Sequence, residues 1–228
     1  MNAELKIPQF QAVDSNNAEI KATEAARASS QMPAREIAVE IVRQLQSHGH
    51  VAVFAGGCVR DEIMGKKPKD FDVATSATPE EIEQIFDRTI PTGKQFGVMT
   101  VVIESIPTEV ATFRGDGQYV DGRRPESVEF FTSASIESMR LDAERRDLTI
   151  NAMFKDPLSS ELFDFFGGKD DIQRGVIRAV GDAEARIKED RLRMIRAIRF
   201  AAVFGFALEV SLVKAIKKNA ARISGARL

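Results

Sequence analysis

The stretch that decides the fold is residues 54–76, FAGGCVRDEIMGKKPKDFDVATS. It joins a glycine pair, Gly56-Gly57, to two aspartates, Asp70 and Asp72. The apolar residues before the glycines predict a strand, CVRDEIMG predicts a helix, and FDVAT predicts a second strand. Because residues i and i+2 of a strand face the same side, DFDVAT is expected to place the two carboxylates next to each other.

The aspartate pair and the glycine pair complement each other chemically. Adjacent carboxylates repel unless a cation lies between them, and Mg²⁺ prefers carboxylate and phosphate oxygens. Glycines let a backbone approach a phosphate closely, and Arg60, one turn into the helix, adds a charged donor. Read separately, the aspartates fit an edge strand facing solvent, and the glycines fit a plain strand-to-helix turn. Together they predict a site for a triphosphate with Mg²⁺.

Composition narrows the class of protein. The 228 residues are 43% hydrophobic, which allows one large domain or two small ones. The net charge of −2 neither indicates nor excludes a nucleic-acid binder, since local basic patches matter more than the sum. Cys58 is the single cysteine, which excludes a disulfide framework and fits a reducing cytoplasm. We find no membrane-spanning run and no secretory signal, and therefore expect a cytoplasmic protein.

The order of predicted elements indicates an α+β chain with two lobes. Residues 1–33 are polar and predict a flexible leader. Residues 34–170 are rich in strands, including a hairpin formed by FGVMTVVIE and TEVATFR, and we assign them to a first domain. Residues 171–228 form the second domain, and everything after Asp182 is predicted to be helical. TPEE at 78–81 predicts a helix start, with a capping threonine and a proline in the first turn.

Three ordered motifs resemble one family. GGCVRDEIMGKKPKDFDVATSATPEEIEQIF is similar to the signature segment of the tRNA nucleotidyltransferase/poly(A) polymerase family, in its bacterial-type CCA-adding branch. RRDLTINAM at 145–153 resembles the family's ribose-recognition motif, and EDRLRMIRAIRF at 189–200 resembles its base-selecting helix. The resemblance covers residues 35–228. It implies a nucleotidyltransferase palm of the DNA polymerase β type with a mixed sheet, followed by an all-helical neck.

The resemblance implies a role for the carboxylates. Asp70 and Asp72 would bind two Mg²⁺ ions, one activating the 3′-hydroxyl of an RNA and one holding the triphosphate and the pyrophosphate leaving group. A third carboxylate often lies on a neighbouring strand of such palms, and Glu109 is our candidate. The alternative interpretation is that Glu109 is an ordinary exposed strand residue.

The motif RRDLTINAM supplies candidate ribose and phosphate ligands. Asp147 and Asn151 are four residues apart and would share a face if the segment were helical. A carboxylate and an amide can bind a ribose 2′-hydroxyl, and Arg146 can contact phosphates. The alternative is a local Arg–Asp salt bridge, worth under about 1 kcal/mol.

The EDRLRMIRAIRF motif carries the candidates for base selection. Arg193, Arg196 and Arg199 recur every third residue, and Asp190 continues the row backward. An aspartate accepts from an exocyclic amino group and an arginine donates to ring acceptors, which suits cytosine and adenine. Uracil and guanine present the reverse order, so Asp190 with Arg193 would select C or A without a template. Arg196 and Arg199 would touch the triphosphate or stack. The alternative is an exposed basic helix face.

The polar loop RGDGQYVDGRRPESVEF also has a family counterpart. In CCA-adding members a flexible segment at this position is linked to the switch from C to A. This chain keeps the loop, with Asp116, Tyr119, Asp121, Arg123 and Arg124, which favours an enzyme able to add A. The alternative is a solvated surface loop.

These residues imply addition of C and A from CTP and ATP to the 3′ end of tRNA. Two alternatives stay open. One is a poly(A) polymerase of the same family, although TGKQFGVMTV stands at 92–101 where bacterial poly(A) polymerases tend to carry a GRRF-like run. The other is a non-catalytic nucleotide- or RNA-binding module. The family's body and tail domains would follow ISGARL, so we expect a fragment or a natural short form. The sequence leaves the oligomeric state open.

Overall fold

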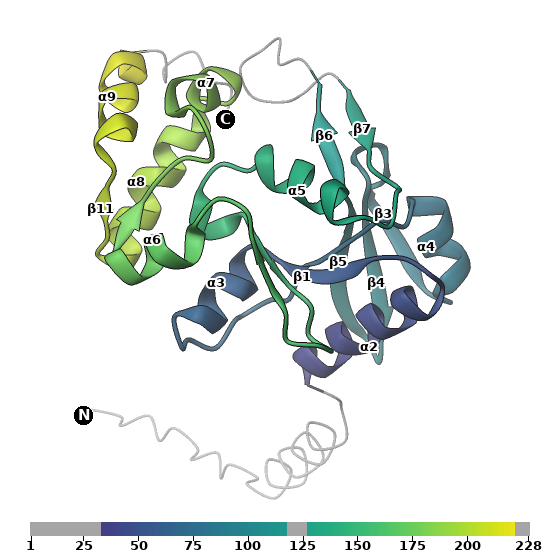
Figure 1. The fold of residues 1–228 in the computed structure, drawn as a ribbon. Coiled ribbons are helices and arrows are strands. Elements are labelled where there is room, and N and C mark those ends of the chain that lie inside the picture. The colour runs from purple at the N-terminus through teal and green to yellow at the C-terminus, as the bar shows by residue number, and fades with distance from the viewer. Residues whose placement is uncertain (1–32, 118–126, 222–228) are drawn as a thin grey trace, which may run out of the picture. The chain divides into compact units, whose positions relative to one another are not determined.

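The computed structural model describes residues 33–117 and 127–221 (Figure 1). The chain divides into two units, Met1–Pro33 and Ala34–Leu228, and the description below concerns the second. The predicted leader, residues 1–33, lies outside the described residues apart from Pro33.

A seven-stranded mixed sheet forms the centre of the first part of this unit. Its strand order is β3-β4-β5-β2-β1-β8-β9. The strands are β1 (Ala52–Ala55), β2 (Val73–Thr75), β3 (Thr89–Gly93), β4 (Val98–Ile103), β5 (Ile106–Thr112), β8 (Met153–Lys155) and β9 (Leu162–Asp164). Strands β2 and β5 run parallel, and the other neighbouring pairs run antiparallel. The predicted mixed sheet is therefore confirmed, as is the hairpin of β4 and β5.

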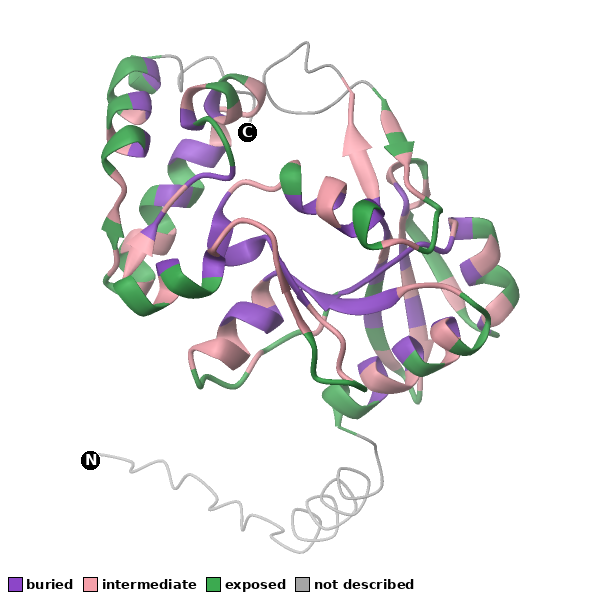
Figure 2. Cartoon of the chain, in the orientation of Figure 1, coloured by how far each residue is buried: buried purple, intermediate pink, exposed green. Residues whose placement is uncertain are grey.

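The strand β1 is buried along its whole length, because helices cover both faces of the sheet here (Figure 2). Val53 and Ala55 belong to a core cluster that includes Met139 of α5 (Ile136–Glu144). Phe54 faces the other side, where the guanidinium of Arg35 from α2 (Ala34–Ser47) lies over its ring. This alternation is the period of two that a strand imposes on its side chains.

Local sequence signals account for the helix boundaries. The helix α4 (Pro79–Ile85) begins with a capping box, in which the Thr78 hydroxyl accepts from the amide of Glu81 and the Glu81 carboxylate accepts from the amide of Thr78. The predicted helix start at residues 78–81 is thereby confirmed. The helix α3 (Gly57–Ile63) follows β1 directly, as predicted from the glycine pair.

Several strand predictions needed correction. The strand β2 begins at Val73, so DFDVAT is not a strand throughout. The carbonyl of Asp72 still accepts from the amide of Ala55, which extends the pairing with β1 by one residue, but Asp70 lies in the preceding loop. The short strands β3 and β8 were not predicted, because brief segments carry too little periodicity.

The polar stretch after β5 was predicted as a loop, yet its first residues form β6 (Arg114–Asp116), which pairs with β7 (Val128–Phe130). Residues after Asp182 were predicted to be helical throughout. They contain the two-residue strand β11 (Ala207–Leu208), which pairs in parallel with β10 (Val176–Ile177).

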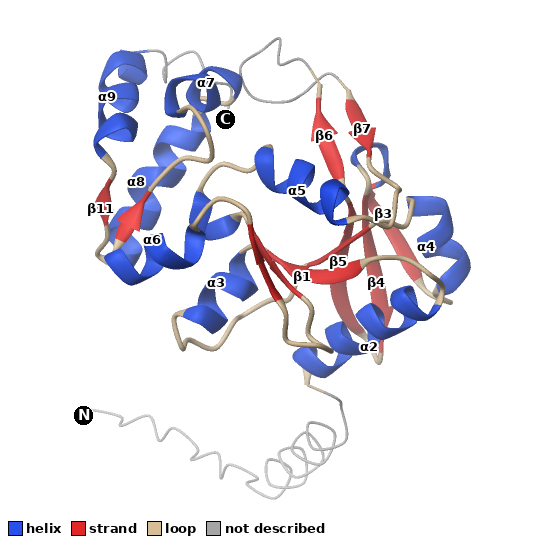
Figure 3. Cartoon of the chain, viewed as in Figure 1, coloured by secondary structure: helices blue, strands red, loops and turns tan. Residues whose placement is uncertain are grey.

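The last part of the chain is otherwise helical (Figure 3). Its helices are α6 (Gly168–Arg174), α7 (Ala183–Glu189), α8 (Leu192–Phe204) and α9 (Val210–Asn219). They bury a second apolar cluster that includes Ile187, Met194 and Leu212. Leu148 and Ile150, from the segment before β8, belong to this same cluster, so the chain leading into β8 packs against these helices.

Gly168 is required where α6 meets the segment before β8. A Cβ at this position would lie 2.2 Å from the carbonyl oxygen of Thr149, which is backbone and cannot yield. We expect Gly168→Ala to lower the free energy of unfolding by about 2–3 kcal/mol, as overpacking does. Urea denaturation followed by circular dichroism measures the change.

Gly65→Ala is the matched control for this substitution. At Gly65 φ is +67° and a Cβ would meet nothing within 4 Å, so the variant carries only the backbone cost, about 1 kcal/mol. A Gly168→Ala protein no less stable than Gly65→Ala would contradict the steric argument.

Candidate functional site

A pocket of about 440 Å³ lies where the sheet, α3 and α8 meet. Most of the predicted site residues line it, although they come from distant parts of the chain. Those residues are Gly56, Gly57, Arg60, Asp72, Glu109, Arg146, Asp147, Asn151, Asp190, Arg193 and Arg196. Asp70 and Arg199 do not line this pocket. They line a neighbouring cavity of about 500 Å³, which shares Gly57, Arg60, Asp72 and Phe200 with the first.

Asp72 and Glu109 stand side by side at the edge of the pocket. The parallel register pairs Val73 of β2 with Val110 of β5, so Asp72, just before β2, and Glu109, on β5, each directly precede a paired residue. Asp72 is exposed and lines the pocket. Removal of water by the surrounding protein, and then the Glu109 carboxylate, raise the pKa of Asp72 to about 6; Arg146 opposes this and Asp70 adds to it. The carboxylates therefore concentrate negative charge that a cation would relieve.

The donor set fits a magnesium ion that also binds phosphate. Within residues 33–117 and 127–221, no group of three or more His, Cys, Asp and Glu side chains is arranged to hold a metal by itself. Mg²⁺ does not need such a cage, since it commonly takes one or two carboxylates and completes its coordination with water and substrate phosphates. Asp72 and Glu109 supply two carboxylates facing one pocket.

The glycine pair brings the backbone close to an arginine. Gly56 precedes α3 with φ at +70° and ψ at −118°, a conformation that favours glycine. A Cβ on Gly56 would lie 3.0 Å from Nη1 of Arg146. The residue is therefore constrained twice, by its backbone and by the guanidinium beside it.

Arg60 connects the start of the fold to its last helices. Its side chain is buried, and Nη1 donates to Oδ1 of Asn151 at 2.6 Å. The guanidinium carbon lies 5.2 Å from the ring centroid of Phe200 and 4.9 Å from that of Phe204, both on α8. Arg60 thus fixes the position of α8 relative to α3 while it lines the pocket.

The segment RRDLTINAM is not one helix. Only Thr149–Asn151 is helical, as a 3₁₀ turn, so the condition under which Asp147 and Asn151 would share a helix face is not met. Both still line the pocket. Asp147 accepts from the amide of Leu148 through Oδ1, and its Oδ2 accepts from Nε of Arg196 at 2.6 Å.

The arginines of the last motif have three different environments. Arg193 is buried and donates to the Glu189 carboxylate at 2.7 Å and to the carbonyl of Arg145 at 3.1 Å. Arg196 pairs with Asp147, and Arg199 is exposed, with its guanidinium carbon 4.9 Å from the ring centroid of Phe200. The row therefore does not act as a single basic face.

Asp190 does not belong to the helix of these arginines. It is the C-cap of α7, and α8 starts at Leu192, so it does not continue the row backward. Its Oδ1 accepts from the amide of Leu192. The turn between the two helices places Asp190 and Arg193 in the wall of the same pocket, which is what the proposed pairing required.

Sequence reasoning missed Asp142, Arg145 and Phe200. Arg145 and Phe200 line the pocket, and Asp142 lies behind it. The alternative interpretation of the motif RRDLTINAM was a local Arg–Asp salt bridge; Arg146 does form one, and its partner is Asp142 rather than Asp147. The spacing was available as a signal, since Asp142 precedes Arg145 and Arg146 by three and four residues.

The long polar loop is only partly described. Asp116 lies on β6 and lines the pocket. The other residues noted there, Tyr119, Asp121, Arg123 and Arg124, lie outside the described residues.

Comparison with known proteins adds independent observations. Residues 52–178 match the family model described as the Poly A polymerase head domain. The CCA-adding enzyme of Geobacillus thermodenitrificans is 46% identical over 188 residues, which are 82% of this chain and 45% of that protein. The CCA-adding enzyme of Bacillus subtilis is 44% identical over 187 residues, 82% of this chain and 46% of that protein.

Solved structures agree with these relatives. The structure of the Bacillus stearothermophilus CCA-adding enzyme in complex with CTP has a TM-score of 0.76 and 40% identity, covering 86% of this chain and 46% of that one. A tRNA nucleotidyltransferase complexed with a primer tRNA and an incoming ATP analog has a TM-score of 0.63 and 30% identity, covering 80% of this chain and 50% of that one. The chain thus spans about half the length of the relatives that it matches.

Proposed function

Because this chain belongs to the poly(A) polymerase head-domain family, we propose that it is a nucleotidyltransferase that adds C and A, from CTP and ATP, to the 3′ end of tRNA without a template. One observation carries the proposal. Asp72 and Glu109, the phosphate-binding candidate Arg146 and the base-selecting candidates Asp190 and Arg193 all line one pocket. The relatives crystallised with CTP and with an ATP analog and primer tRNA bind substrates of this class.

We assign residues 34–170 to a catalytic head and residues 171–228 to the neck that selects the nucleotide. The sheet and its own core cluster support the head, and the cluster around α7, α8 and α9 supports the neck. A cytoplasmic location follows from the proposed substrate. Within the described ranges, none of the helices has both the length and the apolar composition needed to cross a bilayer.

In the proposed reaction, the oxygen of the RNA 3′-hydroxyl forms a bond to the α-phosphorus, the hydroxyl proton leaves, and the bond from that phosphorus to the pyrophosphate oxygen breaks. Asp70, Asp72 and Glu109 would hold Mg²⁺, which would supply positive charge for the attacking and leaving oxygens when bound. Asp70 stays in this set because it lines a third cavity, of about 500 Å³, together with Asp72 and Glu109.

The other side chains bind and orient the nucleotide. Arg60 and Arg146 donate to the triphosphate, next to the close backbone approach that Gly56 and Gly57 allow. Asp147 and Asn151 bind the ribose. For Asp147 this requires that Arg196 release or share the Oδ2 atom that it now contacts. Arg199, from the neighbouring cavity, contacts the outgoing end of the triphosphate.

A transfer assay tests the proposal. The chain is incubated with Mg²⁺ and tRNAs that end before, within and after CC, with each labelled nucleotide supplied alone and together. We expect ordered addition of C, C and A and then a stop. A long A tail on any RNA would identify a poly(A) polymerase instead. Binding of nucleotide without any transfer would favour a non-catalytic module.

A further inference from the structure

Asp142 is a buried carboxylate behind the wall of the pocket. It lies on α5 with 1% of its surface exposed, and it does not line the pocket. Its Oδ1 accepts from Nε of Arg145 at 2.9 Å and from the backbone amide of Arg114 at 3.2 Å. Burial alone would raise the pKa of Asp142, but the guanidiniums of Arg145 and Arg146 outweigh it and lower the pKa. The group is therefore an anion fixed in place from two sides.

The second carboxylate oxygen of Asp142 holds Arg146. Oδ2 accepts from Nε and Nη2 of Arg146 at 3.2 and 2.9 Å. Nη1 of the same guanidinium donates to the carbonyl of Asn151 at 3.2 Å. The guanidinium carbon also lies 4.7 Å from the ring centroid of Phe154. Three contacts and a ring thus define both the position and the plane of the group.

This arrangement leaves Arg146 with capacity for a ligand. A guanidinium has five N–H donors, three are used in the contacts above, and two therefore remain without a hydrogen bond among the described residues, one on Nη1 and one on Nη2. The same group lies beside Gly56 and close enough to Asp72 to lower its pKa. The remaining donors of Arg146 are thus close to both the Asp72 carboxylate and the turn at Gly56.

We infer that Asp142 is a positioning residue for the triphosphate of the incoming nucleotide, and that it acts by holding the guanidinium of Arg146 against the carbonyl of Asn151 and the ring of Phe154. The inference rests on the proposed function. Asp142 itself touches no substrate. It makes Arg146 a rigid, preoriented donor, which spares the cost of ordering a long side chain when the nucleotide binds.

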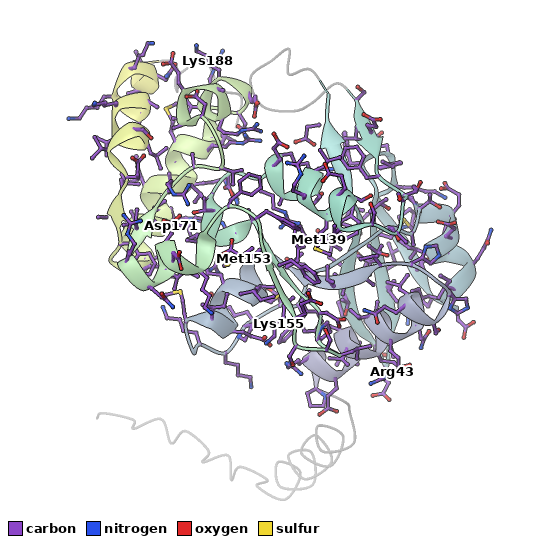
Figure 4. The ribbon with its side chains drawn as sticks, in the orientation of Figure 1. Arg43, Met139, Met153, Lys155, Asp171 and Lys188 are labelled. Atoms are coloured by element: carbon purple, nitrogen blue, oxygen red, sulfur yellow. The ribbon has the colours of Figure 1, made fainter. Side chains whose placement is uncertain are left out.

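The competing explanation is that Asp142 only stabilises the fold, and Asp171 provides the matched comparison. Asp171 is equally buried, at 1% exposure, and it also accepts from an arginine, Nε of Arg178 at 2.9 Å. Asp171, which is labelled in Figure 4, lies on α6 and does not line the pocket. Replacing either acid by asparagine removes one buried charge, but only Asp142→Asn loosens arginines that line the pocket, namely Arg146 and, on the other carboxylate oxygen, Arg145.

The experiment measures the Kd of CTP with Mg²⁺ by calorimetry, without RNA, for the whole chain. We expect Asp142→Asn to raise this Kd about tenfold or more, since hydrogen bonds to charged groups contribute on that scale. Asp171→Asn should leave the Kd of CTP within about twofold of the wild type, because its arginine contacts no ligand. We expect it to lower the melting temperature by about as much as Asp142→Asn does.

A double-mutant cycle separates positioning from a general effect. Arg146→Ala should also weaken CTP binding, and adding Asp142→Asn to it should change the Kd by no more than about twofold, because the positioned group is already gone. If the fold-increases in Kd of the two single variants multiply in the double variant, the two residues act independently and the inference is wrong. A Kd for Asp142→Asn equal to that of the wild type would also overturn it. A wild-type chain that binds neither CTP nor ATP would overturn the proposed function together with the inference.

Arg146→Lys serves if Asp142→Asn does not fold. A lysine keeps the positive charge but cannot contact Asp142 and the carbonyl of Asn151 with a rigid fork. We expect the Kd of this variant for CTP to rise about tenfold, because the charge-assisted contact of Arg146 with both Asp142 and the carbonyl of Asn151 is lost. A Kd within twofold of the wild type would mean that charge alone suffices, and would contradict positioning by Asp142.

Discussion

Replacement of Asp72 by alanine is expected to lower transfer of CMP to tRNA by about 10³-fold or more, the scale on which loss of preorganised charge at the reacting centre acts. Asp72 lines the pocket, the neighbouring cavity that contains Asp70 and Arg199, and a third cavity that Asp70 and Glu109 also line, so it lies where the three meet. CTP should still bind in part, because Arg60 and Arg146 remain. Single-turnover transfer kinetics measure the loss, and calorimetry measures the binding.

Replacing the Asp72 carboxylate by a neutral amide should not harm the fold. The pKa of Asp72 is raised from 3.8 to about 6, so the folded state favours the protonated acid. Without metal, the wild-type chain therefore loses stability as the pH rises from about 4 through 6, because the carboxylate must then ionise beside Glu109. Asp72→Asn removes that loss. We expect its melting temperature at pH 7 without Mg²⁺ to equal or exceed that of the wild type.

Asp87→Ala is the control for a carboxylate outside the site. Asp87 is exposed, lies between α4 and β3, and lines neither the main pocket nor the cavity beside it. Transfer by this variant should match the wild type. Near-normal transfer by Asp72→Ala would contradict the assignment of Asp72 to the carboxylates that bind the metal.

Much of this site was predictable because strong local signals lie next to it. The glycine pair, the capping box at Thr78 and the length of the β4–β5 hairpin each determine an element by short-range physics. Once β2 and β5 are strands, their parallel pairing places Glu109 beside Asp72, as the choice of Glu109 had assumed.

What the sequence could not show depends on tertiary contacts. Nothing local indicates that Arg60 would lie against Phe200 and Phe204, which are far along the chain. The same holds for Arg196, whose partner Asp147 is 49 residues away. The segment RRDLTINAM does not form the helix that the sequence analysis considered, because the chain enters β8 after a single 3₁₀ turn. The apolar spacing of so short a segment fits a helix or a strand equally well.

In the proposed reaction, Asp190 should determine which bases the chain accepts. A carboxylate can only accept hydrogen bonds, so it pairs with the exocyclic amino group of cytosine or adenine, while Arg193 donates to the adjacent ring acceptor. Arg193 is held for this role by Glu189 and by the carbonyl of Arg145. We expect Asp190→Ala to reduce the preference for CTP over UTP by about 10²-fold, since sites that hydrogen-bond a substrate group reject analogues on that scale or above it.

The measurement is kcat/KM for each of the four nucleotides on a tRNA that lacks CCA, with Lys188→Ala as the control. Lys188 lies two residues before Asp190, labelled in Figure 4, and its ammonium group pairs with Glu184 at the exposed side of α7. Its loss should leave the ratio of CTP to UTP unchanged.

Asp190→Asn makes the argument more specific than a simple loss of activity. An amide can donate as well as accept, so it can turn its NH₂ group towards the O4 atom of uracil and still offer its oxygen to the amino group of cytosine. We therefore expect Asp190→Asn to use UTP more readily than Asp190→Ala does, while it keeps more of its activity with CTP. If both variants still exclude UTP and GTP as strictly as the wild type, the selection must come from other groups in the wall of the pocket, and the pairing of Asp190 with the base is wrong.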